Sequence, residues 1–315
     1  MSKGSEIFEL IQTSGSEHEH EHEHESGASM QRDQYLAQTQ VYALIGSPVG
    51  HTLSPIMHNT AFKELGLNCV YHAFDVGIQS AEKAIKGAVA LGFGGLNVTM
   101  PLKELALQYV NPDTWARRLG SINTIDSKGN GYNTDGIGTV RALKEAGVRV
   151  KDSNVLMLGA GGSAKSIAAQ LLTEGARVLV ANRTKNRAVI LAEKMITENI
   201  SCGCGDIEPL GLDEVNSVID EAQVLINTTS VGMHRVAEGQ TLVRAEQMHK
   251  ELVVFDIVYS PLETELLKEA RKAGCMTIDG LKMLVYEGAA AFKIWTGFEA
   301  PIELMESAAR VSLRR

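Results

Sequence analysis

The chain has few aromatic residues, few cysteines and few prolines, and it has no long apolar run. Of its 315 residues, 5% are aromatic, four are cysteine and seven are proline. Its 44% hydrophobic and 22% charged residues are typical of a globular protein, so the composition excludes collagen-like and disordered chains. No apolar stretch reaches the roughly 18 residues of a membrane-spanning helix, and no segment resembles a signal peptide. We therefore expect a cytoplasmic protein without a membrane partner, long enough for two domains.

The four cysteines predict neither a disulfide framework nor a metal centre. Cys202 and Cys204 flank one glycine, whereas Cys69 and Cys275 are isolated in the sequence. A zinc site needs a second pair at ligand spacing or a nearby histidine, and the sequence offers neither. We therefore predict no metal, and ordinary thiols in a reducing compartment are favoured over a metal or redox role for Cys202 and Cys204.

An excess of charge of one sign is also missing once the amino-terminal segment is set aside. Residues 17–25 alternate strictly between Glu and His, which resembles an affinity tag, so we exclude residues 1–29, expect them to be disordered and take Met30 as the native start. The excluded segment holds one of the 30 basic and seven of the 38 acidic residues, which leaves 29 basic and 31 acidic residues in the other 286. A body so close to neutral argues against a nucleic acid or an anionic membrane as partner.

Short β-type runs alternate with helical runs along the whole chain, which predicts βαβ units and largely parallel sheets. Turn residues at 127–130 predict a hairpin between segments 121–126 and 131–133. From Asn154 onward the alternation is typical of a doubly wound sheet. We expect strands at 41–45, 70–76, 95–99, 155–158, 177–181, 224–226, 253–257 and 276–278, and helices at 55–65, 81–91, 102–109, 163–172, 281–295 and 301–311.

The pattern as a whole predicts an α/β protein of two domains. Residues 30–138 together with 281–315 are expected to form a mostly parallel α/β domain. Residues 139–280 are expected to form a Rossmann-type, doubly wound domain inserted between those two segments.

Gly159, Gly161 and Gly162 lie between an apolar strand and a helix start, in the sequence GAGGSA. Glycine there lets the chain turn sharply and lets the backbone approach a pyrophosphate at the amino terminus of the helix. Three glycines after a strand are a weak signal, and a purely structural turn is an equal alternative.

The end of the following strand favours a dinucleotide, and NADP in particular. An NAD site has Asp or Glu about 20 residues beyond the glycines, to accept a hydrogen bond from the ribose 2′-hydroxyl. Here Asn182, 21 residues after Gly161, is followed by Arg183, Thr184 and, further on, Arg187. A guanidinium donates to a phosphate and cannot accept from a hydroxyl, so NADP is predicted. The alternative is a solvated surface with two arginines.

Three further segments are rich in hydroxyls, amides and charge where a core segment would be apolar. Ser54 before Pro55 has an ordinary explanation as a helix cap. Asn133 and Asp135 are also typical turn residues, and Lys103 can be a surface lysine. The segments contain Thr52 and Ser54, then Asn97, Thr99 and Lys103, then Asn123, Asn133, Thr134 and Asp135.

Together the segments resemble the shikimate dehydrogenase family, which includes shikimate/quinate dehydrogenases. The resemblance rests on motifs in the family's order and spacing, and it covers the chain from Val41 to the carboxy-terminal helices. The motifs read GSPVGHTLSPIMHN, NVTMPLK, GSINT, NTDGIG, GAGGSA, NRTKNR, NTTSVGM and DGLKML, with Tyr259 two residues before a proline.

The resemblance implies a role for each matching residue. Lys103 corresponds to the family's catalytic lysine and Asp135 to its acidic partner. Thr52 and Ser54 correspond to the hydroxyls that bind the substrate carboxylate. The resemblance further implies substrate contacts by Thr99, Lys103, Asn123, Asp135, Tyr259 and Glu287, and cofactor contacts by Gly159, Ala160, Gly161, Gly162, Ser163, Asn182, Arg183, Thr184, Arg187, Ile257 and Gly280.

Elementary chemistry agrees with the roles of Lys103 and Asp135. Oxidation of a secondary alcohol needs a hydride acceptor and a group that takes the hydroxyl proton. An unperturbed lysine has a pKa of about 10.4, so Lys103 must be desolvated or otherwise tuned to exchange a proton near neutral pH. We hypothesise a coupled pair across the interdomain cleft, in which Lys103 exchanges the proton and Asp135 orients both the amine and the reacting hydroxyl.

Two residues depart from the family pattern. Thr52 stands where the family usually has Ser, which keeps the hydroxyl and adds a methyl group at the carboxylate end. Glu287 stands where the family usually has Gln. An ionised Glu can only accept hydrogen bonds, and its charge opposes an anionic substrate unless Lys103 or a proton compensates.

The resemblance implies an NADP-dependent oxidoreductase that interconverts 3-dehydroshikimate and shikimate, on the route to chorismate and the aromatic amino acids. It is expected to act on this small molecule in the cytoplasm, as a monomer or homodimer. Two alternatives stay open: a quinate/shikimate dehydrogenase with broader substrate or cofactor use, and a catalytically idle relative that senses a metabolite. Retention of Lys103 and Asp135 argues against the sensor, because a pure binder needs no proton-exchanging pair.

Overall fold

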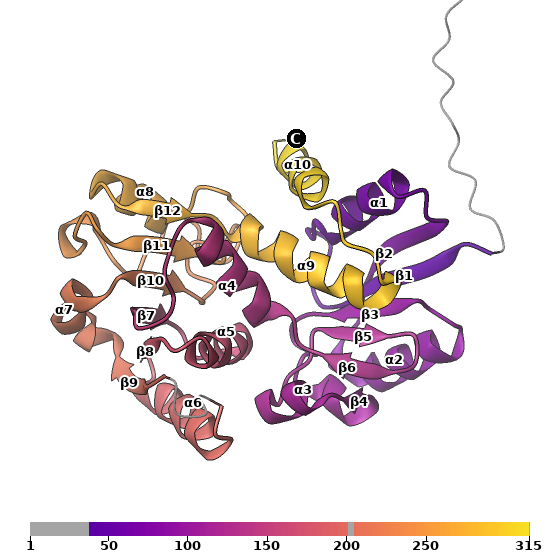
Figure 1. The fold of residues 1–315 in the computed structure, drawn as a ribbon, viewed down its shortest axis with the longest axis horizontal. Helices are drawn as coiled ribbons and strands as arrows, with labels where there is room; N and C mark the ends of the chain where they lie inside the picture. The colour runs from indigo at the N-terminus through magenta and orange to yellow at the C-terminus, as the bar shows by residue number, and fades with distance from the viewer. Residues whose placement is uncertain (1–37, 201–204, 315) are drawn as a thin grey trace, which may run out of the picture. The chain divides into compact units, whose positions relative to one another are not determined.

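The structure is a computed structural model and describes residues 38–200 and 205–314. This part of the chain forms two six-stranded sheets, one from strands before residue 133 and one from strands between residues 154 and 278. Figure 1 shows helices packed against both sheets. The predicted α/β class is confirmed, whereas the expected tag and the Cys202 and Cys204 pair lie outside the described residues.

The first sheet is parallel on one side and ends in a hairpin on the other. Strand β1 pairs in parallel with both β2 and β3, and β3 pairs antiparallel with β5. The predicted hairpin is present between β5 and β6, where Asp126 Oδ1 accepts hydrogen bonds of 2.9 Å from the N–H groups of Lys128 and Asn130. The strand order is β2 (Cys69–Asp75), β1 (Gln40–Gly46), β3 (Gly95–Val98), β5 (Thr124–Asp126), β6 (Asn130–Tyr132) and β4 (Asn111–Pro112).

One helix expected beside this sheet forms differently. Residues 102–109 are a turn followed by the short 3₁₀-helix Leu105–Tyr109, so the prediction of a continuous α-helix was wrong. The carbonyl oxygen of Lys103 accepts a hydrogen bond of 2.9 Å from the N–H of Ile122, which removes it from any helical ladder. This bond ties the segment of Lys103 to the segment that leads into β5.

The second sheet is parallel throughout and doubly wound, as predicted. From β7 the chain adds β8 and β9 on one side, and then returns to add β10, β11 and β12 on the other. The direction therefore reverses between β7 and β10, and ligands of such sheets bind at the carboxyl ends of the strands at this point. The order is β12 (Met276–Ile278), β11 (Val253–Asp256), β10 (Val224–Asn227), β7 (Asn154–Leu158), β8 (Arg177–Asn182) and β9 (Ile207–Gly211).

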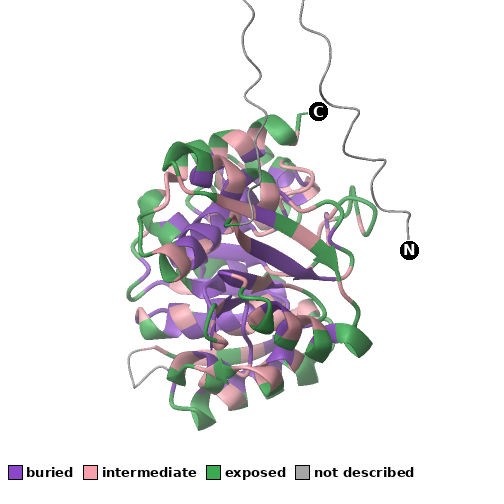
Figure 2. Cartoon of the chain, turned by 90° about the vertical axis from the view of Figure 1, so that its right-hand side faces the viewer, coloured by how far each residue is buried: buried purple, intermediate pink, exposed green. Residues whose placement is uncertain are grey.

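Apolar clusters cover both faces of this sheet, which explains its continuous apolar strands. Figure 2 shows the buried residues in the interior of the molecule and the exposed residues on its outer helices and loops. In β7, Val155 and Met157 belong to one apolar cluster and Leu156 and Leu158 to the other, and all four side chains are fully buried. Alternate residues of a strand point to opposite faces, so each cluster lies on one side of the sheet. The helices of this half are α5 (Gly162–Thr173), α6 (Lys185–Thr197), α7 (Val215–Val218) and α8 (Glu265–Lys272).

Helices α4 (Asp135–Glu145) and α9 (Gly280–Thr296) lie against each other and connect the two sheets. The predicted domain boundary at residue 138 falls within α4, a helix that sequence analysis did not predict. The helices of the first half are α1 (Ser54–Glu64), α2 (Ala81–Ala90), α3 (Thr114–Leu119) and α10 (Ile302–Ser312). None of the helices in the described ranges is long and apolar enough to cross a membrane.

Two glycines let α4 approach its neighbours closely. A Cβ atom added at Gly138 would lie 2.8 Å from the carbonyl oxygen of Met283 in α9. One added at Gly136 would lie 2.4 Å from the carbonyl oxygen of Ser166 in α5. Because both contacts are with backbone, neither can be relieved by a side-chain rotation. The position of α4 between α9 and α5 therefore depends on glycine.

We predict that Gly138→Ala lowers the free energy of unfolding by about 1–3 kcal/mol, because α4 and α9 must move apart. The matched control is Gly87→Ala in α2, where no atom lies within 4 Å of the added Cβ. That change is expected to raise the free energy of unfolding by about 0.5–1 kcal/mol, because Ala favours the helix. Urea unfolding measures both. A Gly138→Ala protein as stable as the parent would contradict the close packing.

Candidate active site

Lys103 and Asp135 form an ion pair. Lys103 follows β3, and Asp135 is the first residue of α4. The Lys103 Nζ lies 2.7 Å from one carboxylate oxygen of Asp135 and 2.9 Å from the other. The Asp135 side chain is fully buried, and that of Lys103 is 14% exposed. The structure thus brings together the two residues to which the resemblance gives catalytic roles.

The Asp135 carboxylate is held in place by the segment before α4 and by Asn123. The Nδ2 of Asn123 donates hydrogen bonds to Asp135 Oδ1 at 2.5 Å and to Thr134 Oγ1 at 3.0 Å. Its Oδ1 accepts a hydrogen bond of 2.9 Å from the N–H of Thr134. Asn133 Oδ1 accepts a hydrogen bond of 3.2 Å from the N–H of Asp135. Asn123 and Asn133 are therefore more than turn residues: Asn123 donates to the carboxylate of Asp135, and Asn133 accepts from its backbone N–H.

Two opposing effects act on the pKa of Lys103. Burial lowers it, but the negative charges of Asp135 and Glu287 raise it by more, so the pKa lies above its ordinary value. Lys103 is desolvated, as expected, but its pKa is not lowered toward neutral pH. The amine is therefore protonated and can donate a proton.

Glu287 lies on α9 beside this pair. Its carboxyl group is hydrogen-bonded to that of Asp135. Burial, the charge of Asp135 and this hydrogen bond raise the pKa of Glu287 well above its ordinary value, and the positive charge of Lys103 offsets only part of the effect. The carboxyl group of Asp135 is therefore shared between the amine of Lys103 and the carboxyl group of Glu287.

Hydroxyl groups gather next to the three charged residues. Thr52 Oγ1 donates to Ser54 Oγ at 3.2 Å, and the side chain of Thr52 is also hydrogen-bonded to Tyr259. Ser54 is hydrogen-bonded to Tyr71. Burial and the charge of Glu287 raise the pKa of Tyr259 to about 12, so its phenol is a neutral donor.

Tyr71 is a residue that sequence analysis missed. It belongs to β2, and its hydroxyl donates a hydrogen bond of 2.7 Å to Asn97 Oδ1. Asn97 in turn donates to the carbonyl of Asn123 at 3.1 Å, so a polar chain links β2 with the residue that holds Asp135. Thr99 follows β3 on the same segment, with its methyl group against Gly46. No sequence motif marks Tyr71, because a Tyr in a strand is ordinary core.

The turn after β7 has the geometry that a pyrophosphate needs. Gly159 has a φ of 108°, and a Cβ there would lie 2.7 Å from Thr228 Oγ1, so only glycine fits. At Gly161 and Gly162 a Cβ would meet no atom within 4 Å, which leaves open space over the amino terminus of α5. Ala160 and Ser163 complete the turn. An anion can approach these backbone N–H groups, so the turn fits a dinucleotide.

The other predicted cofactor residues lie at the same edge of the second sheet. Asn182 ends β8, beside β7, and its side chain donates to the carbonyl of Thr184 at 2.9 Å. Arg183 and Arg187 are exposed, and no partner for either guanidinium is found among the described residues. On the other side of β7, past β10, Ile257 follows β11 and contacts Gly280, the first residue of α9. A Cβ at Gly280 would lie 2.3 Å from the carbonyl oxygen of Ile257.

A buried network at the ends of β10 and β11 fixes the loops on that side. Asp256 accepts hydrogen bonds from Asn227 at 2.9 Å, from Thr264 at 2.7 Å and from the N–H of Val258 at 3.0 Å. Burial raises the pKa of Asp256 to about 6, although these donors lower it. Sequence analysis missed this network, although the polar residues Asn227 and Asp256 at the ends of two apolar strands could have indicated it.

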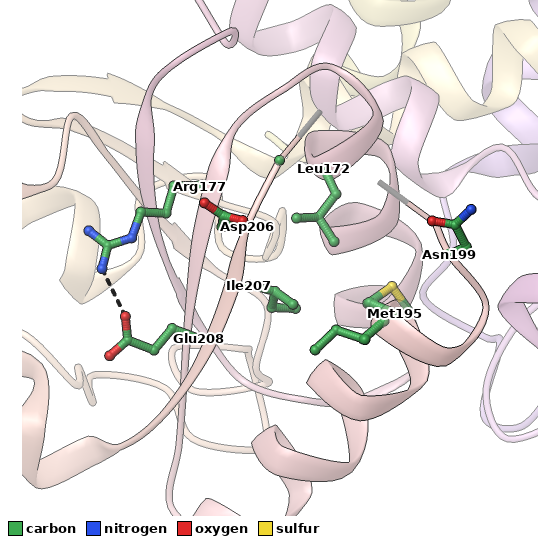
Figure 3. Close-up of a pocket in the computed structure, with 9 residues that line it drawn as sticks. Leu172, Arg177, Met195, Asn199, Asp206, Ile207 and Glu208 are labelled. Atoms are coloured by element: carbon green, nitrogen blue, oxygen red, sulfur yellow. Dashed lines mark hydrogen bonds and ion pairs between the residues drawn. The ribbon is translucent and has the colours of Figure 1, made fainter. Parts of the chain in front are cut away.

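A cavity lies away from these residues. It measures about 580 Å³ and lies at the outer edge of the second sheet, between α6 and β9 (Figure 3). Two of its charged residues, Arg177 and Glu208, pair with each other at 2.8 Å. None of the predicted site residues lines it: the lining residues are Leu172, Arg177, Met195, Ile196, Asn199, Gly205, Asp206, Ile207 and Glu208. The described residues contain no group of three or more side chains placed to hold a metal ion.

Comparison with known proteins finds matches along nearly all of the chain outside the amino-terminal segment. Residues 44–125 match the shikimate dehydrogenase substrate binding domain, residues 141–284 match shikimate / quinate 5-dehydrogenase, and residues 280–310 match the shikimate 5′-dehydrogenase C-terminal domain.

Individual relatives are similar over almost their full length. Shikimate dehydrogenase (NADP+) of Methanococcoides burtonii is 51% identical over 269 residues, which cover 85% of this chain and 96% of the relative. A crystal structure of shikimate dehydrogenase in complex with NADP+ has a TM-score of 0.83 at 44% identity, over 90% of this chain and 98% of the other. The Thermus thermophilus enzyme in complex with NADP(H) and shikimate has a TM-score of 0.77 at 36% identity, over 87% and 99%.

Proposed function

Because the chain belongs to the shikimate dehydrogenase family, we propose that it catalyses the reversible, NADP-dependent reduction of 3-dehydroshikimate to shikimate, a step toward chorismate and the aromatic amino acids. The observation that carries this proposal is the buried Lys103–Asp135 ion pair, at 2.7 Å, next to a cluster of neutral hydroxyls. A binding module has no need of a buried amine that can give up a proton.

Reduction of a ketone to an alcohol requires a hydride on the carbon and a proton on the oxygen. Bound NADPH supplies the hydride. Lys103 gives its Nζ proton to the substrate oxygen, and its raised pKa ensures that the proton is present when the substrate arrives. Asp135 fixes the amine and accepts a hydrogen bond from a substrate hydroxyl. In the reverse direction Lys103 must take up the proton, which its high pKa also favours once the amine is neutral.

The remaining polar residues suit an anionic substrate with ring hydroxyls. We assign the substrate carboxylate to Thr52 and Ser54, which offer hydroxyl donors without a negative charge of their own. Thr99 and Asn123 are assigned to ring hydroxyls, and Tyr259 and Glu287 complete the site. The support is chemical: Thr52 and Ser54 offer neutral donors, whereas Lys103 and Asp135 form the charged pair.

We assign the cofactor to the edge of the second sheet where the strand order reverses. The turn from Gly159 to Ser163 would hold the pyrophosphate, and Arg183 and Arg187 the 2′-phosphate, with Asn182 and Thr184 beside them. Ile257 and Gly280 would lie toward the nicotinamide. Residues 139–280 form the NADP-binding domain in this proposal, and residues 30–138 with 281–315 form the substrate-binding domain.

We place the enzyme in the cytoplasm because its four cysteines suit a reducing compartment. The assigned residues come from one chain, so a monomer or a homodimer can hold a complete site.

The activity is tested by following NADPH absorbance. With shikimate and NADP+ the protein is expected to form NADPH, with a kcat/KM at least about tenfold above that with shikimate and NAD+, since the lost 2′-phosphate contacts are worth about 1.5–3 kcal/mol each. A higher kcat/KM for quinate would assign the broader activity. If no pair of substrate and cofactor turns over, the chain is a sensor and the proposal fails.

The cofactor assignment predicts that loss of either arginine affects the KM for NADP+ and not the KM for NAD+. Arg183→Gln and Arg187→Gln are each expected to raise the KM for NADP+ about tenfold or more, and to change the KM for NAD+ little. Arg149→Gln is the matched control, because its exposed guanidinium lies at the opposite edge of the sheet, before β7. An equal loss for both coenzymes would show that the arginines do not read the 2′-phosphate.

A further inference from the structure

The site around Lys103 holds two carboxyl groups and one amine. Lys103 pairs with Asp135, and the carboxyl group of Glu287 is hydrogen-bonded to that of Asp135. The packing of α9 on α4 holds Glu287 there: its carbonyl accepts a hydrogen bond of 3.2 Å from Thr134 Oγ1, and its Cβ would lie 3.3 Å from a Cβ at Gly138. The three residues come from three parts of the fold: the segment after β3, the start of α4 and the middle of α9. If both carboxyl groups were ionised, the site would hold one net negative charge next to the fully buried carboxylate of Asp135, which is costly.

The other titratable side chains near Glu287 cannot balance this charge. Tyr71 of β2 and Tyr259, after β11, both feel the charge of Glu287, and burial raises the pKa of each phenol, so both are neutral. His58 of α1 stacks on Tyr71 with ring centres 4.4 Å apart. Burial lowers the pKa of His58 to about 3, so it is neutral as well. No second cation faces Glu287 among the described residues.

A hydrogen bond between two carboxyl groups requires a proton, because a carboxylate can only accept. Asp135 already accepts from Lys103 Nζ through both oxygens and from Asn123 at 2.5 Å. These donors favour its charged form. The side chain of Glu287 has no donor from the described residues, so a proton shared by the two carboxyl groups belongs on Glu287.

We propose that Glu287 is protonated in the ligand-free enzyme, donates a hydrogen bond to Asp135, and thereby keeps the site neutral so that an anionic substrate can bind. This rests on the proposed function in one respect, namely that the substrate carries a carboxylate. A protonated Glu has the shape and the donor of a Gln, but it can lose its proton. Substrate binding in this chain is therefore pH-dependent, in a way that a Gln at position 287 would not allow.

The consequence is a dependence of KM on pH. Above the pKa of Glu287 in the free enzyme, only the protonated fraction binds the substrate well, so the KM for shikimate rises about tenfold per pH unit. Ionisation of Glu287 acts on the substrate and not on the distant 2′-phosphate site, so the KM for NADP+ is expected to stay constant over the same range.

The first experiment compares pH profiles of KM for shikimate in the parent protein, Glu287→Gln and Glu303→Gln. Whatever the level of its activity, Glu287→Gln is expected to lack the rise in KM that the parent shows. Glu303→Gln removes an exposed carboxylate of α10 by the same chemical change and is expected to keep the parent profile. A rise in KM of equal slope in Glu287→Gln would overturn the proposal.

The second experiment detects the proton without any substrate. The infrared spectrum of the parent at neutral pH is expected to contain the C=O stretch of one protonated carboxylic acid that the spectrum of Glu287→Gln lacks. Glu303→Gln is expected to keep this band. Its absence from the parent overturns the proposal even if shikimate is turned over. Its presence in a protein without activity on shikimate supports protonated Glu287 and contradicts the proposed function instead, so the two failures are distinguishable.

Discussion

The site depends on one electrostatic constraint: the carboxylate of Asp135 is fully buried and must be neutralised. Lys103 supplies the opposite charge, and Asn123 supplies a hydrogen bond. Both must therefore come within hydrogen-bond distance of the first turn of α4. The backbone hydrogen bond from Ile122 to Lys103 holds the lysine near this turn, and it takes the place of the α-helical hydrogen bond that the Lys103 carbonyl would otherwise accept.

The same helix relates the charged pair to the cofactor turn. Gly136, next to Asp135, lets α4 touch α5 at Ser166, and α5 begins at the glycine turn after β7. Gly138 lets α4 touch α9, which carries Glu287. A catalytic group must be held within a few tenths of an ångström of its working position, and backbone contacts through glycine hold it more firmly than side-chain contacts could.

The repeated β and α pattern predicted ten of the twelve described strands, because apolar strands and helices of ordinary length have strong periodic signals. The two edge strands β4 and β9 were not predicted, since β4 has only two residues and Ile207–Gly211 contains a proline and a glycine. Helix α4 was not predicted, since two glycines in its first turn lower its helix propensity and their purpose is visible only in the packing. Lys103 and Asp135 were identified through the family resemblance, because residues 32 positions apart show no local sign of pairing. The pKa shift of Lys103 required the position of Glu287, which only the tertiary structure provides.

The account stands on Lys103 and Asp135 acting as a unit, and a double-mutant cycle on kcat tests this most directly. Lys103→Met and Asp135→Asn are each expected to lower kcat by about 10²–10⁴-fold, with a smaller change in substrate affinity. Combined, they are expected to lower kcat no further than the more damaging single change, because either one already disables the pair. Losses that multiply, or a Lys103→Met enzyme with near-normal turnover, would contradict the account.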